Sequence, residues 1–190
     1  TAIFATNFPR RMSFLDKLIV STLPVVPKSV VGQFSKRYIA GVSLQDAVRV
    51  IKGLNQKKMM TTLDLLGEDI HREIEAEGMK SKCIEMFREI QRIELDSNVS
   101  VKLSQLGLRV SKDTCYRNVR AIVEEARTLN NFVRIDMEDS TATSDTLEIF
   151  HRLKGEGFQN VGAVIQAYLK RSDADVRELV KVGANIRVCK

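Results

Sequence analysis

The sequence has no apolar stretch long enough to cross a membrane. Its longest apolar run, Leu18–Val26, contains Pro24 and is far shorter than the roughly 20 apolar residues that a membrane-spanning helix needs. The N-terminus also makes a poor signal peptide, because Phe4 and Phe8 precede an arginine pair and no clean cleavage site follows. These absences argue against an integral membrane protein and leave an interfacial anchor open.

Cysteine and histidine are scarce. Cys83, Cys115 and Cys189 show neither the spacing of a metal site nor the even number of a disulfide framework. His71 and His151 are the only histidines, and they lie far apart in helical patterns. We therefore predict no metal site, and reduced, mostly buried thiols in a cytoplasmic protein.

The basic excess is confined to the N-terminal third of the chain. Residues 1–60 contain 10 Lys and Arg against 2 Asp and Glu, whereas residues 61–190 contain 20 against 22. Such a segment could lie on anionic lipid or nucleic acid. Few aromatic residues interleave with these charges, which favours a solvated helical face. Nucleic acid is therefore not an expected partner, and peripheral contact with the inner face of a membrane remains an option.

The pattern along the chain changes near residue 59. Residues 1–58 indicate a helical segment interrupted by prolines, with Ser43 and Asp46 placed as an N-cap box. Residues 59–190 predict alternating strands and helices, which is typical of a parallel sheet with helical crossovers. The strand candidates are Met59–Leu66, Val99–Leu103, Phe132–Asp136, Val161–Gln166 and Ile186–Cys189; the intervening helices run to about Arg92, over Lys112–Leu129 and Thr143–Gly155, and from Ser172 to near Gly183.

Two α/β architectures suit five such units: a doubly wound sheet and an incomplete (β/α)₈ barrel. The first strand leads into Asp64-Leu-Leu-Gly-Glu68 and not into a glycine-rich phosphate loop, so nucleotide binding at the first turn has no support. Each of the first four strands has a polar residue at or near its C-terminal end, and a ring of such residues is how a barrel builds a site. We therefore expect the barrel, with about its first five strands in this chain.

The stretch Phe132–Ser140 is the most informative part of the sequence. A short apolar strand leads directly into Asp136, Glu138 and Asp139, and carboxylates gathered at such a junction are costly unless something pairs or uses them. Asp136 either orients a lysine or a substrate amine, or caps a helix. Ser140 and Thr141 are better candidates for the cap, which favours a functional role for Asp136.

Three further polar residues lie in apolar strand surroundings. Lys102 is expected to point inward and to need an anion, either from a ligand or from Asp136 or Glu68. Gln166 follows a fully apolar strand and offers both a donor and an acceptor. Arg187 would project a permanent cation from a central strand, so it needs a phosphate, a carboxylate or an anionic cofactor ring as its partner.

The order of these motifs resembles proline dehydrogenase, a flavin-dependent enzyme family of proline catabolism, in its monofunctional bacterial form. The resemblance covers about residues 35–190. The matching motifs are Asp64-Leu-Leu-Gly-Glu68, Lys102-Leu-Ser-Gln-Leu-Gly-Leu108, Arg134-Ile-Asp-Met-Glu-Asp-Ser140, Val164-Ile-Gln-Ala-Tyr-Leu169 and Asn185-Ile-Arg-Val-Cys-Lys190, with Arg37-Tyr-Ile-Ala-Gly41 as a helical lead-in.

The resemblance implies a distorted (β/α)₈ barrel that holds FAD and oxidises L-proline to 1-pyrroline-5-carboxylate, with hydride passing to flavin N5 and electrons then to a quinone. Lys102 would bind the substrate carboxylate, held in place by Asp136, and Glu68 resembles the family's gate carboxylate. The residues implied near the flavin are Met137, Gln166, Arg187 and Lys190, with Arg187 near N5.

The family pattern continues beyond Lys190, so we expect this chain to be a segment of a longer enzyme and inactive alone. The alternatives are a non-catalytic half-barrel remnant or assembly subunit, and a relative that oxidises hydroxyproline. The oligomeric state stays open.

Overall fold

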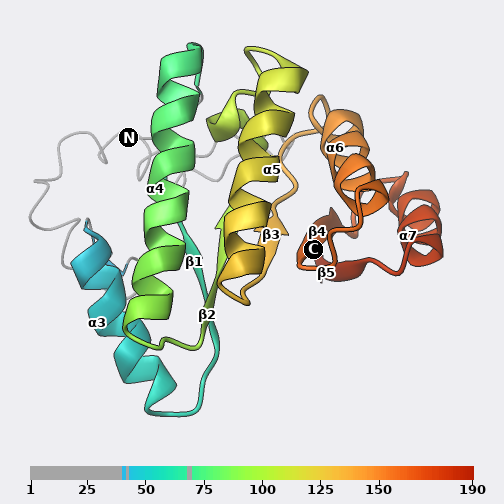
Figure 1. Ribbon diagram of the computed structural model, residues 1–190. Helices are drawn as coiled ribbons and strands as arrows, with labels where there is room; N and C mark the ends of the chain where they lie inside the picture. The colour runs from blue at the N-terminus through green and yellow to red at the C-terminus, as the bar shows by residue number, and fades with distance from the viewer. Residues whose placement is uncertain (1–39, 42, 68–69) are drawn as a thin grey trace, which may run out of the picture. The chain divides into compact units, whose positions relative to one another are not determined.

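The computed structural model describes residues 40–41, 43–67 and 70–190 (Figure 1). The chain divides into two compact units, Thr1–Val50 and Ile51–Lys190. The helices predicted before Gly41 lie outside the described residues, and the predicted domain boundary at residue 58 stays a prediction. No helix in the described ranges combines the length and apolarity needed to span a bilayer.

Helix α3, Leu44–Asn55, begins where the sequence predicts it. The Ser43 hydroxyl accepts a hydrogen bond from the Asp46 backbone N–H at 3.2 Å and donates one to the Asp46 carboxylate at 2.9 Å. This arrangement satisfies one of the backbone N–H groups that an α-helix leaves unpaired at its start.

The second unit alternates strands and helices. Its elements are β1 (Thr61–Asp64), α4 (Glu73–Arg92), β2 (Ser97–Val101), the 3₁₀ helix η2 (Leu103–Leu106), α5 (Lys112–Thr128), β3 (Val133–Ile135), α6 (Thr143–Gly155), β4 (Val161–Gln166), α7 (Ser172–Lys181) and β5 (Asn185–Cys189). The predicted bounds of α6 and β4 match the observed ones, and the other elements differ by a few residues at their ends.

All four strand pairs are parallel, and the strands lie in the order β1-β2-β3-β4-β5. A doubly wound sheet would reverse this order at a switch point, whereas a barrel adds each strand beside the previous one. The helices cover one face of the curved sheet (Figure 1). The predicted barrel-type fold, present as five of its strands, is therefore confirmed.

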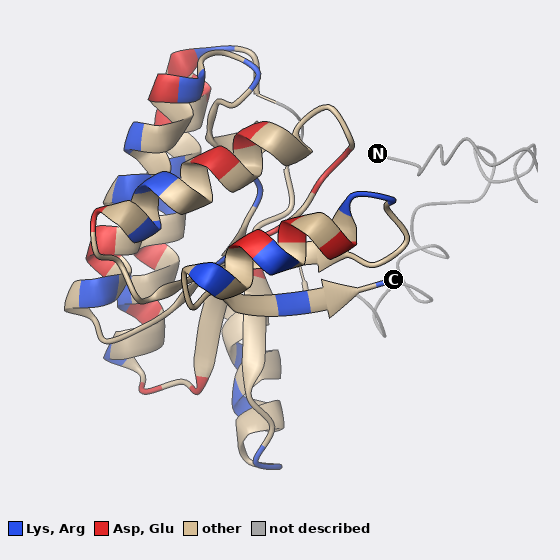
Figure 2. Cartoon of the chain, turned by 90° about the vertical axis from the view of Figure 1, so that its right-hand side faces the viewer, with Lys and Arg blue, Asp and Glu red and all other residues tan. Residues whose placement is uncertain are grey.

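The core lies between the sheet and these helices. Alternate strand residues point towards the helices, and among them Val99, Val133, Ile135 and Ala163 are fully buried. Phe87 of α4 is also fully buried. Figure 2 shows charged residues mainly on the helices, which leaves the opposite face of the sheet for the few polar residues that the strands carry.

Candidate active site

Polar side chains gather at the carboxyl ends of the strands. The strand register pairs Asp64 with Ser100, Ile135 with Val101, and Arg187 with Val164. Because strand side chains alternate between faces, Asp136 points away from the helices, opposite to its neighbour Ile135. The same alternation places Asp64, Lys102, Asp136 and Arg187 on the face of the sheet that the helices do not cover.

Lys102 lies between two carboxylates. Its Nζ is 2.5 Å from Oδ2 of Asp64 and 4.0 Å from Oδ2 of Asp136. All three side chains are about one-third exposed or less. The nearer partner, Asp64, was not among the partners predicted for Lys102, and the other predicted partner, Glu68, lies outside the described residues. Asp136 is close enough to orient the lysine, at the outer limit of an ion pair.

Asp136 also pairs with Arg187, through Oδ1 of the carboxylate and Nη2 of the guanidinium. The Asp136 side chain is 17% exposed, and that of Arg187 is 43% exposed. The cation that the sequence predicts to need an anion therefore has one from the protein. Asp136 occupies the centre of the site, because it is the one carboxylate shared by Lys102 and Arg187 among the described residues.

The other carboxylates of the acidic stretch hold the loops in place. Glu138 accepts a hydrogen bond from the Ser104 backbone N–H at 2.9 Å and another from the Ser104 hydroxyl, which ties the loop after β3 to the loop after β2. Ser104 and Glu138 each lie two residues beyond a central site residue, Lys102 and Asp136. This contact therefore limits how far the lysine and the aspartate can separate.

Asp139 orders the turn that leads into helix α6. Its Oδ1 accepts hydrogen bonds from the backbone N–H groups of Thr141 at 2.8 Å and of Ala142 at 3.2 Å. The pKa of Asp139 lies below its usual value, first because the Thr141 hydroxyl donates to it, and also because of these backbone donors and Arg109. The prediction that Ser140 or Thr141 caps this helix is wrong, because Ala142 occupies the N-cap position and no side chain forms a cap hydrogen bond there.

Gln166 and Met137 lie at the same edge of the sheet. Met137 is buried, and Gln166 is half-buried with an Oε1 atom that has no hydrogen-bond partner. Oδ1 of Asp64 is likewise buried without a partner. Other described residues also have buried polar atoms without a partner, among them Asn98 and Asn160 at the amino ends of the strands, so these two acceptors are available to a ligand but do not by themselves mark a site. Lys190 follows β5 and is exposed.

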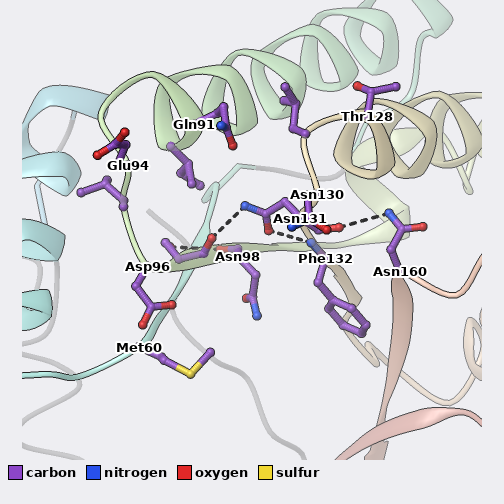
Figure 3. Close-up of a pocket in the computed structure, with 14 residues that line it drawn as sticks. Met60, Gln91, Glu94, Asp96, Asn98, Thr128, Asn130, Asn131, Phe132 and Asn160 are labelled. Atoms are coloured by element: carbon purple, nitrogen blue, oxygen red, sulfur yellow. Dashed lines mark hydrogen bonds between the residues drawn. The ribbon is translucent and has the colours of Figure 1, made fainter.

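A separate hollow of about 670 Å³ lies at the amino ends of the strands (Figure 3). Two of its asparagines join neighbouring segments by hydrogen bonds to the backbone. The Asn131 side chain donates to the Ser97 carbonyl at 3.0 Å, and the Asn160 side chain donates to the Asn131 carbonyl at 3.2 Å. Among the described residues, no Lys, Arg or His lines it. Reactive groups of barrel enzymes gather at the opposite end of the strands, so we assign this hollow a structural role.

The cysteines and histidines form no metal site in the part of the chain that the structure describes, where no group of three or more His, Cys, Asp or Glu is placed to hold an ion. Cys83 and Cys115 are buried and Cys189 is exposed. Burial raises the pKa of Cys83 to about 12 and also raises that of Cys115. The two buried thiols are therefore unreactive near neutral pH.

Comparison with known proteins agrees with the geometry. The family model for proline dehydrogenase matches residues 47–187. Proline dehydrogenase 1 of Bacillus subtilis (strain 168) is 35% identical over 156 residues, which are 82% of this chain and 51% of that protein. Proline dehydrogenase of Deinococcus radiodurans is 33% identical over 160 residues, 82% of this chain and 52% of that protein. The chain thus spans about half the length of these relatives.

Among solved structures, proline utilization A from Bdellovibrio bacteriovorus, inactivated by N-propargylglycine, superposes with a TM-score of 0.75 at 28% identity. The match covers 90% of this chain and 21% of that one. Proline utilization A from Bradyrhizobium japonicum matches at a TM-score of 0.60 and 19% identity, which supports the fold alone.

Proposed function

The chain belongs to the proline dehydrogenase family, and from that premise we propose that the protein oxidises L-proline to 1-pyrroline-5-carboxylate with FAD as its cofactor. The observation that carries the proposal is the network of Asp64, Lys102, Asp136 and Arg187 at the carboxyl ends of four strands. Bound FAD would supply the hydride acceptor, N5, for the ring carbon beside the proline nitrogen.

The substrate carboxylate would bind at Lys102. Its ammonium is held between Asp64 and Asp136, so its direction is set before any ligand arrives. Among the described residues, Lys102 is the cation that lies between two carboxylates at this edge of the sheet, while the other cation of the network, Arg187, pairs with Asp136. Lys102 is therefore the proposed contact for the substrate carboxylate. Glu68, in the role of a gate carboxylate over the substrate, stays part of the proposal and lies outside the described residues.

The cofactor ring would lie against Met137, Gln166 and Arg187. The unpaired Oε1 of Gln166 is an acceptor suited to a ring N–H, and Met137 offers an apolar contact surface. The Arg187 guanidinium can stabilise negative charge that builds up on the ring. Lys190, at the end of β5, is the proposed start of the next cofactor-binding loop.

A membrane quinone is the proposed electron acceptor. The basic N-terminal segment is proposed to contact the inner face of a membrane, and its residues 1–39 lie outside the described residues. Neutralising Arg10, Arg11 and Lys17 should reduce binding of the intact gene product to anionic vesicles, and unchanged binding would remove this element of the proposal.

The direct test uses the intact gene product. We expect the purified protein to show a flavin absorbance spectrum that bleaches when L-proline is added without oxygen. Bleaching by hydroxyproline in preference to proline would point to the hydroxyproline-oxidising alternative. A folded but colourless protein would refute the flavoenzyme and favour the non-catalytic alternative.

A variant series tests the residue assignments. Arg187→Met should slow flavin reduction by roughly 100-fold, as expected for loss of one preorganised charge at a reacting centre. Arg177→Met is the matched control, because Arg177 pairs with Asp173 on the outer face of α7 and both side chains are more than 70% exposed. A wild-type rate in Arg187→Met would show that Arg187 is wrongly placed.

A further inference from the structure

Arg134 of β3 reaches across the neighbouring strand β4 to the edge strand β5. Its Nη1 donates to the backbone carbonyl of Asn185 at 3.1 Å, and its Nη2 donates to the Asn185 side-chain carbonyl at 2.8 Å. The guanidinium thus holds both the main chain and the side chain of one β5 residue. Such a two-pronged contact needs the planar fork of arginine.

Gly162 makes this crossing possible. In the register of the sheet it is paired with Arg134 on one side and with Asn185 on the other. A Cβ atom at Gly162 would lie 2.5 Å from Nη1 of Arg134, 2.6 Å from the Asn185 carbonyl and 2.7 Å from the Phe132 ring. The Phe132 ring also lies 4.8 Å from the guanidinium, which it supports by a cation–π contact. A glycine inside a strand often marks such a close approach.

A second bridge runs between the same two strands in the opposite direction. Two residues further along β5, Arg187 pairs with Asp136, which lies two residues beyond Arg134. One bridge therefore extends from β3 to β5, and the next extends from β5 back to β3. Both pass over β4, at Gly162 and at Val164.

The partners of Arg134 indicate what this bridge does. No carboxylate lies within ion-pair distance of Arg134 among the described residues, and its hydrogen bonds go to amide carbonyls. Burial lowers the pKa of Arg134, and nearby Arg187 lowers it further, while Asp136 raises it. A half-buried cation without a carboxylate partner contributes little to stability. We therefore look to the position of β5 for the role of Arg134.

We propose that Arg134 and Asn185 are positioning residues, which hold β5 so that the Arg187 guanidinium stays against Asp136 at the reacting centre. The inference rests on the proposed function, because it assigns Arg187 a role at the cofactor ring. Neither residue needs to touch substrate or cofactor.

The test measures proline-dependent flavin reduction in the intact gene product. Asn185→Ala should slow reduction by about 10- to 100-fold, the usual effect of misplacing a reacting group by about 1 Å. Arg134→Lys should slow it similarly, because lysine keeps the charge but cannot form the fork. In an Arg187→Met background, Asn185→Ala should cause no further slowing, since it acts through Arg187. Arg177→Met again serves as the exposed control.

Amide hydrogen exchange gives a second readout that needs no flavin. Asn185→Ala should raise the amide exchange rates of β5 by at least about tenfold, because β5 should open locally more often without the bridge. The exchange rates of β2 should be unchanged. If the protein bound no flavin, the proposed function would fail while exchange still decided whether the bridge orders β5. The inference is overturned if Asn185→Ala reduces flavin at the wild-type rate, if its effect multiplies with that of Arg187→Met, or if β5 exchange is unchanged.

Discussion

Replacing Gly162 by alanine is the sharpest test of the crossing between β3 and β5. The added methyl would lie 2.5 Å from Nη1 of Arg134, which can move because it ends a flexible side chain. It would also lie 2.6 Å from the backbone carbonyl of Asn185, which cannot move without pulling β5 from β4. The backbone contact therefore determines the outcome.

The expected loss of stability follows from two opposing effects. Overpacking of this kind costs about 1–3 kcal/mol. Alanine also restricts the unfolded chain, which returns about 0.4–1 kcal/mol. Because the backbone contact cannot relax, the upper half of the overpacking range, about 2–3 kcal/mol, applies here. Gly162→Ala should therefore lower the free energy of unfolding by about 1–2.6 kcal/mol and the Tm by about 2–10 °C.

Thermal unfolding followed by circular dichroism measures this change. Gly78→Ala is the matched control, because Gly78 lies inside α4 with no atom near its added Cβ. That change should raise stability by about 0.5–1 kcal/mol, the helix preference of alanine over glycine. If Gly162→Ala were as stable as the wild type, the close packing of Arg134 over Gly162 would be refuted.

Three further outcomes are expected. A thiol reagent near pH 8 should label the exposed Cys189 rapidly and label Cys83 and Cys115 only on unfolding. Burial raises the pKa of both thiols, and it raises the pKa of Cys83 to about 12. Rapid labelling of Cys83 or Cys115 would contradict the packing. Asp139→Asn should lower stability by about 0.2–1 kcal/mol at pH 7, the usual value of an exposed ion pair, because the contact with Arg109 loses its negative charge. Because the folded pKa of Asp139 is depressed, its contribution is present above the unfolded pKa and is lost as pH falls through the folded value, so the variant and the wild type should converge in acid. Glu138→Ala should slow flavin reduction in the intact gene product by about tenfold or more, because it removes the contact with Ser104 that limits the separation of Lys102 and Asp136. The apparent proline affinity is a companion measurement. An unchanged rate would mean that Lys102 and Asp136 keep their positions without the Glu138 contact.

Alternating patterns in the sequence predict most of this fold. The strand Val161–Gln166 and the helix Thr143–Gly155 have the predicted bounds, because each has a clear apolar period and clear end signals. Ser111, which directly precedes the predicted start of α5 at Lys112, caps that helix by accepting a hydrogen bond from the Thr114 backbone N–H. Ser172 does not cap α7, since its hydroxyl donates to the Gln166 carbonyl and Arg171 occupies the N-cap position. Serine can make either contact, and local sequence does not distinguish them.

The sequence predicts which residues belong to the site better than it predicts which of them form ion pairs with each other. The sequence places Lys102 among carboxylates, yet its nearest partner, Asp64, follows from the register of β1 against β2. Register depends on packing over the whole strand pair and is not encoded in the residues next to the lysine. Arg134 was not predicted as a site residue. The available signals were its alternation with Asp136 and an isolated glycine in a predicted strand, at Gly162.

The Arg134–Asn185 and Arg187–Asp136 bridges also favour the correct register of β5 in the sheet. A slip of one residue would turn Asn185 and Arg187 to the helix-covered face and lose both bridges. A slip of two residues would keep the correct face but bring the Arg187 guanidinium to the place that Asn185 now occupies, against Arg134. Two like charges would then meet in a half-buried space, a repulsive contact. The amide at position 185 and the cation at position 187 thus disfavour a one-residue slip of β5 and this two-residue slip, so that the alignment of β5 and the Asp136–Arg187 pair depend on each other.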